Sequence, residues 1–379
     1  MSPVNSPTRP SGGGTNSQPV SESLARARIQ AAIGNSDQAI AILQAALASQ
    51  PDHPESWLEL GDLLEQRGEQ LPALLAWFEA VMRAQSTGKW IDQSTTPTEL
   101  LGSVVRAIEQ IRARRREIYF GSYEDLRKQH GALALARVDR ALSAHLRERD
   151  GKPTDPRQKP RFFYFPDLPS KPYLNPEDHP WAASLRASFP GIREEATELL
   201  HQDGFFEDFV RIRKGDRIEN YLGGAKPKWS AFFFYRHGVR NDANHLRCPV
   251  TSHSLESIEL CRIAHHAPEI CFSILTPGTH ILPHYGVTNV RSVMHLPLLV
   301  PKDCALNLVD VGEHAWREGE LVMFDDTFLH ESWNRSDTMR VILLMDCWNP
   351  YLAPVERQAV SRLIETIGRL HQAARSTPG

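Results

Sequence analysis

Residues 34–47 of this chain recur in altered form 34 residues further on, at 68–81. In this alignment Ala39 matches Ala73, Leu43 matches Trp77 and Ala46 matches Ala80. The small alanines repeat at the positions where paired helices must approach closely. A period of 34 residues is typical of stacked helix–turn–helix units. The first third of the chain is therefore predicted to be a helical repeat.

This repeat resembles the tetratricopeptide repeat. The second unit carries more of that pattern, in Trp57, Leu60, Gly61, Leu64, Ala73, Trp77 and Ala80. The first unit departs from it in its first helix, at Ser23, Arg26 and Gln30. Two units fall short of the usual three or more, so we expect a helical stretch over 98–149 to complete the stack. Two roles stay open: a groove that binds a peptide, or a support for the next domain or for a dimer.

Composition narrows the classes of protein that need to be considered. The 379 residues suffice for about two to three domains. Lys and Arg number 43 against 46 Asp and Glu, which argues against a protein that coats nucleic acid. Apolar runs such as 231–235 and 341–345 are far too short to cross a membrane. Residues 1–20 lack the apolar segment of a secretory signal, so a disordered leader and a cytoplasmic location are predicted.

The five cysteines do not predict a disulfide framework or a zinc cluster. They are sparse, odd in number and include no Cys-x-x-Cys pair. We expect them to be small buried residues.

The chain changes character after a Pro-rich, charged segment at 151–160, which is predicted to be a linker. Short segments rich in β-branched and aromatic residues follow, and they predict strands at 230–235, 270–275, 291–299, 305–311, 320–324 and 340–347. No helical pattern alternates with them, which disfavours a parallel sheet. An α+β multidomain chain is predicted, with helical repeats at 21–150 and an antiparallel jelly roll at 161–379. Helices are expected at 181–200 and 355–374.

Histidine is the residue type that points to chemistry, since 16 are present. His280 and His284 lie beside an expected turn, His295 lies in an expected strand, and His330 follows another. Two imidazoles from distant strand ends are one way to hold a redox metal. A single histidine is more often structural, and we read His53, His265, His266 and His280 in that way.

The order of residues between Ser273 and Pro350 resembles the aspartyl/asparaginyl β-hydroxylase family of Fe(II)- and 2-oxoglutarate-dependent oxygenases. The stretches that carry the resemblance are 277–280, 283–291, 294–296, 319–326, 330–333 and 340–350, with a weaker extension back to Trp229. The resemblance covers roughly a third of the chain. It implies a double-stranded β-helix fold of the cupin type.

The resemblance also implies roles for single residues. His284 and His330 match the two iron ligands. Arg340 matches the arginine that binds the distal carboxylate of 2-oxoglutarate with the help of Ser273, and a planar guanidinium suits a carboxylate. His295 matches a contact of the other carboxylate of 2-oxoglutarate. For the substrate, Arg291 matches a basic residue and Trp229 an aromatic wall of the pocket.

Gly286 stands two residues after His284, where most oxygenases with this chemistry carry an acidic ligand. The resembled family lacks that ligand too, so water or another group is expected at the iron there. Asp325 and Asp326 are possible substitutes, but we expect them to orient the loop that carries His330. Glu331 is expected to be structural.

Two departures from animal members of the family concern binding. Val293 stands where those members carry a second arginine for 2-oxoglutarate, and Gly224 stands where an arginine binds the acidic side chain of the substrate. Lys226 or Lys228 could restore a positive charge. These departures leave the iron chemistry intact and the substrate open.

The preferred hypothesis is a dioxygenase that uses Fe(II), 2-oxoglutarate and dioxygen to hydroxylate the β-carbon of an Asp or Asn side chain in a peptide or protein. A small metabolite or a lipid-linked acyl chain stays open as the substrate, as does a protein partner for the repeats. The alternative is a repeat-based adaptor whose barrel has lost catalysis and binds only a metal or ligand.

Overall fold

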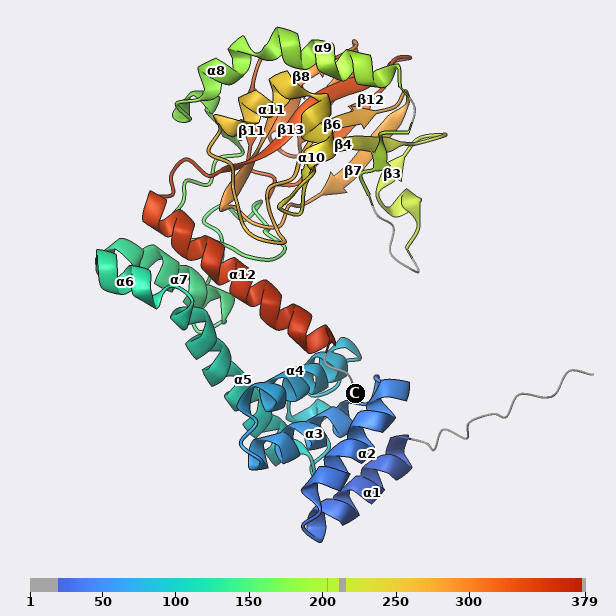
Figure 1. Cartoon of the computed structure of the whole chain (residues 1–379), viewed down its shortest axis with the longest axis vertical. Coiled ribbons are helices and arrows are strands. Elements are labelled where there is room, and N and C mark those ends of the chain that lie inside the picture. The colour runs from blue at the N-terminus through green and yellow to red at the C-terminus, as the bar shows by residue number, and fades with distance from the viewer. Residues whose placement is uncertain (1–19, 203, 211–215, 377–379) are drawn as a thin grey trace, which may run out of the picture. The chain divides into compact units, whose positions relative to one another are not determined.

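A computed structural model describes residues 20–202, 204–210 and 216–376 (Figure 1). The predicted leader at 1–20 lies outside these residues except for Val20. The chain divides into two compact units: residues up to Arg115 together with those from Arg369, and residues 116–368. The division falls inside a helix and not at the sequence-predicted linker. Where independently folding domains begin and end stays a prediction.

The first unit confirms the helical repeat. Helices α1 (Val20–Ala32) and α2 (Ser36–Ser49) form one pair, and α3 (Pro54–Gln66) and α4 (Gln70–Ser86) form the next. Each helix of the second pair begins 34 residues after its counterpart in the first. The repeated alanines at 39, 73 and 80 are fully buried, and so are Trp57 and Trp77. Gly61 lies against the Trp77 ring with no room for a Cβ, which explains the glycine in this pattern.

The helical stretch expected at 98–149 is present but broken. It consists of α5 (Leu101–Gly121), α6 (Glu124–His130), a short 3₁₀ turn at Leu133–Leu135, and α7 (Ala136–His145). A further 3₁₀ turn at Gln93–Thr95 precedes it, capped by Asp92. Residues from Arg116 onward belong to the second unit, so only part of this stretch extends the repeat stack.

The second unit is built around two antiparallel sheets, as the sequence predicted. The larger sheet has the order β1-β11-β8-β13-β6-β4-β2, with β5 on β4. Its strands are β1 (Tyr173–Leu174), β2 (Glu207–Asp208), β4 (Trp229–Arg236), β5 (Val239–Arg240), β6 (Ile270–Leu275), β8 (Arg291–Leu299), β11 (Val322–Phe324) and β13 (Arg340–Trp348). The smaller sheet has the order β10-β9-β12-β7-β3, formed by β3 (Leu222–Gly223), β7 (Thr279–His284), β9 (Cys304–Leu308), β10 (Gly312–Ala315) and β12 (His330–Asn334).

From β6 to β13 the chain passes back and forth between the two sheets. This winding is that of a jelly roll, and it confirms the predicted fold class. The strands expected at 270–275 and 291–299 have those bounds. The strand expected at 305–311 ends at Leu308, and the one expected at 320–324 begins at Val322.

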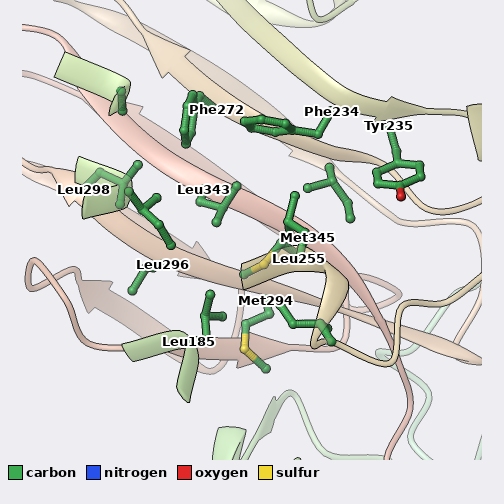
Figure 2. Close-up of a cluster of buried hydrophobic side chains, with 14 of the residues drawn as sticks. Leu185, Phe234, Tyr235, Leu255, Phe272, Met294, Leu296, Leu298, Leu343 and Met345 are labelled. Carbon is green, nitrogen blue, oxygen red and sulfur yellow. The ribbon is translucent and has the colours of Figure 1, made fainter. Parts of the chain in front are cut away.

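Strand alternation divides the side chains of the larger sheet between two environments. On β8, Met294, Leu296 and Leu298 face outward and join one apolar cluster, whereas Val293 lies in another, inside the barrel. Figure 2 shows the outer cluster, in which Phe272 and Leu343 from the sheet belong with Leu185 and Leu255 from the covering helices. This cluster supplies the apolar packing of the larger sheet on its outer face. The polar side chains of the same strands therefore point into the barrel.

Helices cover that outer face (Figure 1). They are α8 (Ala182–Ala187), α9 (Phe189–Leu200), α10 (Asp242–Arg247) and α11 (Pro249–Glu256), with a 3₁₀ turn at Pro176–Asp178 before them. The single helix expected at 181–200 is interrupted at Ser188, because Pro190 in the first turn of α9 cannot continue a helix from α8. A 3₁₀ turn at Ile218–Asn220 leads into β3, and α12 (Pro354–Ser376) follows β13. Among the described residues, no helix is both long and apolar enough to span a membrane.

The sequence-predicted linker is attached to the barrel at its end. Gln158 is buried and forms a bridge to Phe328, and the backbone N–H of Lys159 donates to the Thr327 carbonyl at 2.8 Å. The chain then continues along the residues that follow β7, with Phe163 paired to Thr288. This segment is therefore part of the rim of the barrel.

Candidate active site

Two histidines face each other across neighbouring strands of the smaller sheet. His284 ends β7 and His330 begins β12, and the antiparallel register places them directly opposite each other. Their ring centroids are 4.1 Å apart. Neither strand was predicted from the sequence. Pro283 in β7 and the polar residues at the start of β12 interrupt the alternation of apolar and polar residues that predicts a strand. These two segments become strands because they pair with each other in the sheet.

The backbone fixes which nitrogen of each ring is available. His284 Nδ1 lies 2.9 Å from the Leu282 carbonyl oxygen, and His330 Nδ1 lies 2.9 Å from that of Phe328. A carbonyl only accepts, so each Nδ1 carries the proton and donates, which leaves Nε2 as a free lone pair. Burial lowers the pKa of His330 to about 4 and also lowers that of His284. Both rings are therefore neutral at pH 7, the form that binds a metal.

Two imidazoles are what the chain offers to a metal at this point. Within the described ranges, no group of three or more His, Cys, Asp or Glu side chains is spaced to hold an ion. The position two residues after His284 is Gly286, and a Cβ there would overlap the carboxylate of Asp326. The backbone N–H of Gly286 also donates to the carbonyl oxygen of Asp326 at 2.5 Å. A carboxylate from another loop therefore occupies the space beside Gly286.

The two acidic residues before β12 have different partners. Asp326 Oδ2 pairs with Arg291 at 3.0 Å, while its buried Oδ1 has no hydrogen-bond partner. Asp325 accepts from the Thr327 backbone and hydroxyl and from Gln158 Nε2 at 2.7 Å. Burial raises the pKa of Asp325 to about 7. Asp325 thus holds the loop that carries His330, whereas the Asp326 carboxylate lies against Gly286.

Arg340 is a buried cation without an anion. Its side chain is 1% exposed, and its Nη1 lies 3.3 Å from the Ser273 carbonyl and 3.4 Å from the Ser273 hydroxyl. Its Nε has no partner, and no carboxylate of the described residues forms an ion pair with it. Burial lowers the pKa of Arg340 to about 10. A guanidinium in this state fits a carboxylate ligand, which supplies the missing partner.

Ser273 links Arg340 to the predicted substrate residue Trp229. The indole Nε1 of Trp229 donates to the Ser273 hydroxyl at 2.8 Å. The Trp229 ring also stacks on Phe209, with centroids 3.8 Å apart and planes 6° apart. Trp229 is therefore held between Ser273 and Phe209, next to Arg340.

His295 completes the polar interior on β8. It is buried, and its Nδ1 has no partner. Burial, followed by the charges of Arg340 and His330, lowers its pKa well below the ordinary value. Its ring contacts Phe324 and Trp316, and Arg340 lies over the same Trp316 ring at 5.1 Å. The structure thus gathers His284, His330, His295, Arg340 and Ser273 in one barrel interior.

Arg291, the predicted substrate contact, is enclosed between two carboxylates. Its Nη2 lies 3.0 Å from Asp326 and its Nη1 lies 3.0 Å from Asp346, and the side chain is 13% exposed. Burial alone would lower its pKa, but the two carboxylates outweigh burial and raise it. The arginine is therefore paired with two carboxylates of the described residues, although its Nη1 forms no hydrogen bond in spite of the 3.0 Å separation from Asp346. Its role as a substrate contact stays a prediction.

Asp346 was not singled out from the sequence. It lies on β13 six residues from Arg340, so the two-residue period of a strand places both on the inner face. The six-residue spacing from Arg340 could therefore have identified Asp346 from the sequence as a residue that faces into the barrel. The partnership with Arg291 required the β8–β13 register, in which Trp348 opposes Arg291.

Two of the noted departures have structural reasons. Val293 packs in an apolar cluster with Leu306, Phe324 and other barrel residues, an unsuitable place for a second arginine. Gly224 has a positive φ of 123°, and a Cβ there would overlap the Gly278 carbonyl. The backbone, and not only the sequence, therefore excludes an arginine at this position.

The other histidine of β7, His280, has an ordinary structural environment. Its Nε2 lies 2.6 Å from Glu331, which also accepts from Asn307 at 2.8 Å. Glu331 is thus part of a surface network.

Comparison with known proteins gives a family match for each of the two regions. The family described as Aspartyl/Asparaginyl beta-hydroxylase matches residues 186–350, and a tetratricopeptide repeat family matches residues 24–88. The rat aspartate beta-hydroxylase domain-containing protein 2 is 30% identical over 248 residues, which are 64% of this chain and 68% of the rat protein. Human aspartyl/asparaginyl beta-hydroxylase is 32% identical over 203 residues, 51% of this chain and 24% of the human protein.

A bacterial relative has a different named substrate. The ornithine lipid ester-linked acyl 2-hydroxylase of Rhizobium tropici is 31% identical over 189 residues, 49% of this chain and 64% of that protein. The antiparallel jelly roll and these sequence matches together define a domain of the hydroxylase class. The chain belongs to the aspartyl/asparaginyl β-hydroxylase family.

Proposed function

We propose that the chain is an Fe(II)- and 2-oxoglutarate-dependent dioxygenase that hydroxylates an sp³ carbon. One observation carries this proposal: two neutral imidazoles with free Nε2 atoms share a barrel interior with a buried, unpaired arginine. The two imidazoles fit a divalent metal, and the guanidinium of Arg340 fits one end of a dicarboxylate. Burial of an uncompensated charge lowers the stability of the fold by roughly several kcal/mol. A barrel that served only as a scaffold would not be expected to contain one.

The residues present fit both groups. His284 and His330 would hold the metal through Nε2, with the backbone bonds at Nδ1 fixing the orientation of each ring. Arg340 and the Ser273 hydroxyl would bind the distal carboxylate of 2-oxoglutarate. Fe(II) with 2-oxoglutarate supplies the oxidation, in which dioxygen gives one oxygen atom to a C–H bond and the other to succinate, with release of carbon dioxide.

The rest of the barrel interior positions and shields the reactants. Trp229 holds the Ser273 hydroxyl, and His295 and Arg340 both contact the Trp316 ring. The apolar cluster around Val293 and Phe324 excludes water from this end of the barrel. Asp326, beside Gly286, has a buried Oδ1 without a partner, which would accept a hydrogen bond from a ligand bound near the histidine pair.

The preferred substrate is an Asp or Asn side chain of a peptide or protein, hydroxylated at its β-carbon. The family and the human relative support this choice, and the tetratricopeptide repeats would present a protein partner. The Rhizobium relative supports a lipid-linked acyl chain as the second candidate. A small metabolite is the third, and a catalytically inactive adaptor is the alternative outside the enzymes.

Turnover of 2-oxoglutarate tests the proposal. The Fe(II)-loaded full chain is incubated with 2-oxoglutarate and dioxygen, and succinate is measured, with mass spectrometry for the gain of one oxygen atom in candidate substrates. We expect turnover by the natural chain and its loss in His330→Ala. His253→Ala, a change of an exposed histidine, serves as the matched control. Absence of both 2-oxoglutarate binding and turnover in the natural chain would leave only the adaptor.

A further inference from the structure

An acidic substrate needs a cation near the histidine pair, and one that is not already paired with carboxylates would bind it at the least cost. Arg291 is enclosed by Asp326 and Asp346, with 13% of its side chain exposed. Withdrawing it to bind a substrate would leave the carboxylates of Asp326 and Asp346 without their shared cation, which is unfavourable for buried groups. Position 224 cannot carry a side chain without meeting the Gly278 carbonyl.

The exposed lysines at 226 and 228 lie at the wrong end of the strand. The backbone N–H of Lys228 donates to the hydroxyl of Thr279, the first residue of β7, at 3.1 Å. His284 is the last residue of that strand. Five residues of extended chain separate the two ends by about 16 Å, at roughly 3.3 Å per residue. These lysines therefore belong to the turn before β7.

Arg161 lies at the correct end. Its backbone N–H donates to the Gly286 carbonyl at 3.1 Å, two residues beyond His284. The next two backbone N–H groups, of Phe162 and Phe163, both donate to the Val287 carbonyl, at 2.9 and 3.1 Å. The buried Gln158 holds the start of the same segment through its bond to Asp325. Arg161 is thus fixed by backbone bonds beside the metal-ligand strand.

The side chain of Arg161 is exposed and uncommitted. Among the described residues, no carboxylate forms an ion pair with it, whereas Arg157 in the same segment is paired with Asp155. Lys159, also exposed, lies over the Tyr285 ring at 5.4 Å and adds a second positive charge to this rim. The segment lies outside the 186–350 match to the family.

We propose that Arg161 binds the free carboxylate of the substrate at the rim of the barrel, and so selects acidic substrates. This inference rests on the proposed hydroxylase function, since it names the substrate class of the same site. The guanidinium would meet the carboxylate bidentately, with Lys159 strengthening the local positive field. The carboxyl group of an ester-linked acyl chain forms the ester, so the chain that is hydroxylated carries no charge beside its reacting carbon, and the inference favours an aspartyl side chain.

The test compares two small probes that differ only in the charged group. N-acetyl-aspartate amide and the neutral N-acetyl-asparagine amide are titrated into the metal-free full chain, with binding followed by saturation-transfer NMR. We expect the natural chain to bind the carboxylate probe about tenfold more tightly, and Arg161→Gln to abolish that preference. Arg161→Lys should keep part of it. Arg149→Gln, which changes another exposed arginine of the same unit, should leave it unchanged.

A parallel titration separates the two unpaired guanidiniums. Arg340→Met removes the buried one, and a preference due to Arg161 should survive in that variant. Equal binding of both probes by the natural chain, or a preference that persists in Arg161→Gln, would overturn the inference. These are binding measurements, so a natural chain that discriminates the probes but forms no succinate would contradict the hydroxylase proposal alone.

The source of the carboxylate is decided in a turnover arm. The Fe(II)-loaded chain with 2-oxoglutarate is given either free aspartate or an aspartyl peptide, and oxygen incorporation is read by mass spectrometry. For the probe that is modified, Arg161→Gln should raise KM about tenfold and change kcat little. Modification of an ester-linked acyl chain in preference to both acidic probes would contradict the selection of acidic substrates.

Discussion

The carboxylate of Asp326 occupies the space that a side chain at position 286 would need. The two residues come from different segments, one following β7 and one preceding β12, and they are joined by the 2.5 Å hydrogen bond from Gly286 N–H to the Asp326 carbonyl. The glycine where other oxygenases carry an acidic ligand is therefore a steric requirement of this barrel.

Gly286→Ala should destabilise the protein and impair metal binding. The added Cβ overlaps the Asp326 carboxylate, which must move and disturb its ion pair with Arg291. We expect a loss of about 2–3 kcal/mol in the free energy of unfolding, measured by urea denaturation. Gly121→Ala in the same unit, where nothing lies within 4 Å, is the control and should cost almost nothing. Equal effects of the two changes would contradict the steric explanation.

Arg291→Met should unfold the protein more readily, whatever its effect on a substrate. The change leaves Asp326 and Asp346 buried without their shared cation, and breaking such a group costs roughly 3–5 kcal/mol. Urea denaturation gives the value. Arg317→Met, which removes an exposed pair with Glu320, should change stability by no more than about 0.5 kcal/mol. A variant of Arg291 with natural stability and a raised KM would show a substrate contact instead.

Arg340→Met should not lower the stability of the ligand-free chain, in contrast to Arg291→Met. It removes a buried cation that has no anion, so we expect the ligand-free chain to be as stable as the natural one or more so. The natural chain should gain about 2.7 kcal/mol of stability from 2-oxoglutarate at one hundred times its Kd, and the variant should gain none. Thermal unfolding with and without 2-oxoglutarate checks this. A variant that still gains stability would place the carboxylate site elsewhere.

Glu269 should make stability fall as the pH rises from 5 to 8. Burial, and then the charge of Asp346, raises its pKa to about 7 from the unfolded value near 4.5. The folded state therefore holds a proton that the unfolded state has lost, which disfavours folding progressively until the pH exceeds 7. Glu269→Gln should remove about 2 kcal/mol of this decline between those pH values. Urea denaturation at both pH values, with the exposed Glu320→Gln as the control, is the measurement.

Gly61→Ala should destabilise the repeat unit. A Cβ there overlaps the buried Trp77 ring, whose Nε1 donates to Asp62 at 3.0 Å and cannot easily move. We expect a loss of about 2–3 kcal/mol, followed by circular dichroism during denaturation. Gly102→Ala, in a helix with open space around it, should instead stabilise by about 0.5–1 kcal/mol. Tolerance of alanine at 61 would contradict the close approach of α3 and α4.

The sequence predicted correctly those strands that lie between two other strands of the larger sheet. The bounds of β6 and β8 follow from β-branched and apolar content, because these strands lie inside the larger sheet between other strands. β7 and β12 were missed because their residues are polar or include Pro283, and the pairing between them supplies the order that propensity does not. The site residues assigned from the resemblance come together in the barrel. Their roles in catalysis stay predictions.

The sequence by itself determined the helical repeat, the antiparallel barrel, the family, and the candidate histidines and arginines, because periodicity and motif order are local properties of the chain. Only the tertiary structure decided which arginines are free. Arg291 and Arg340 both lie on inner strand faces, yet among the residues that the structure describes Arg291 meets two carboxylates and Arg340 meets none. That difference arises from strand register and from a loop that follows no strand period, so it depends on contacts between residues far apart in the sequence.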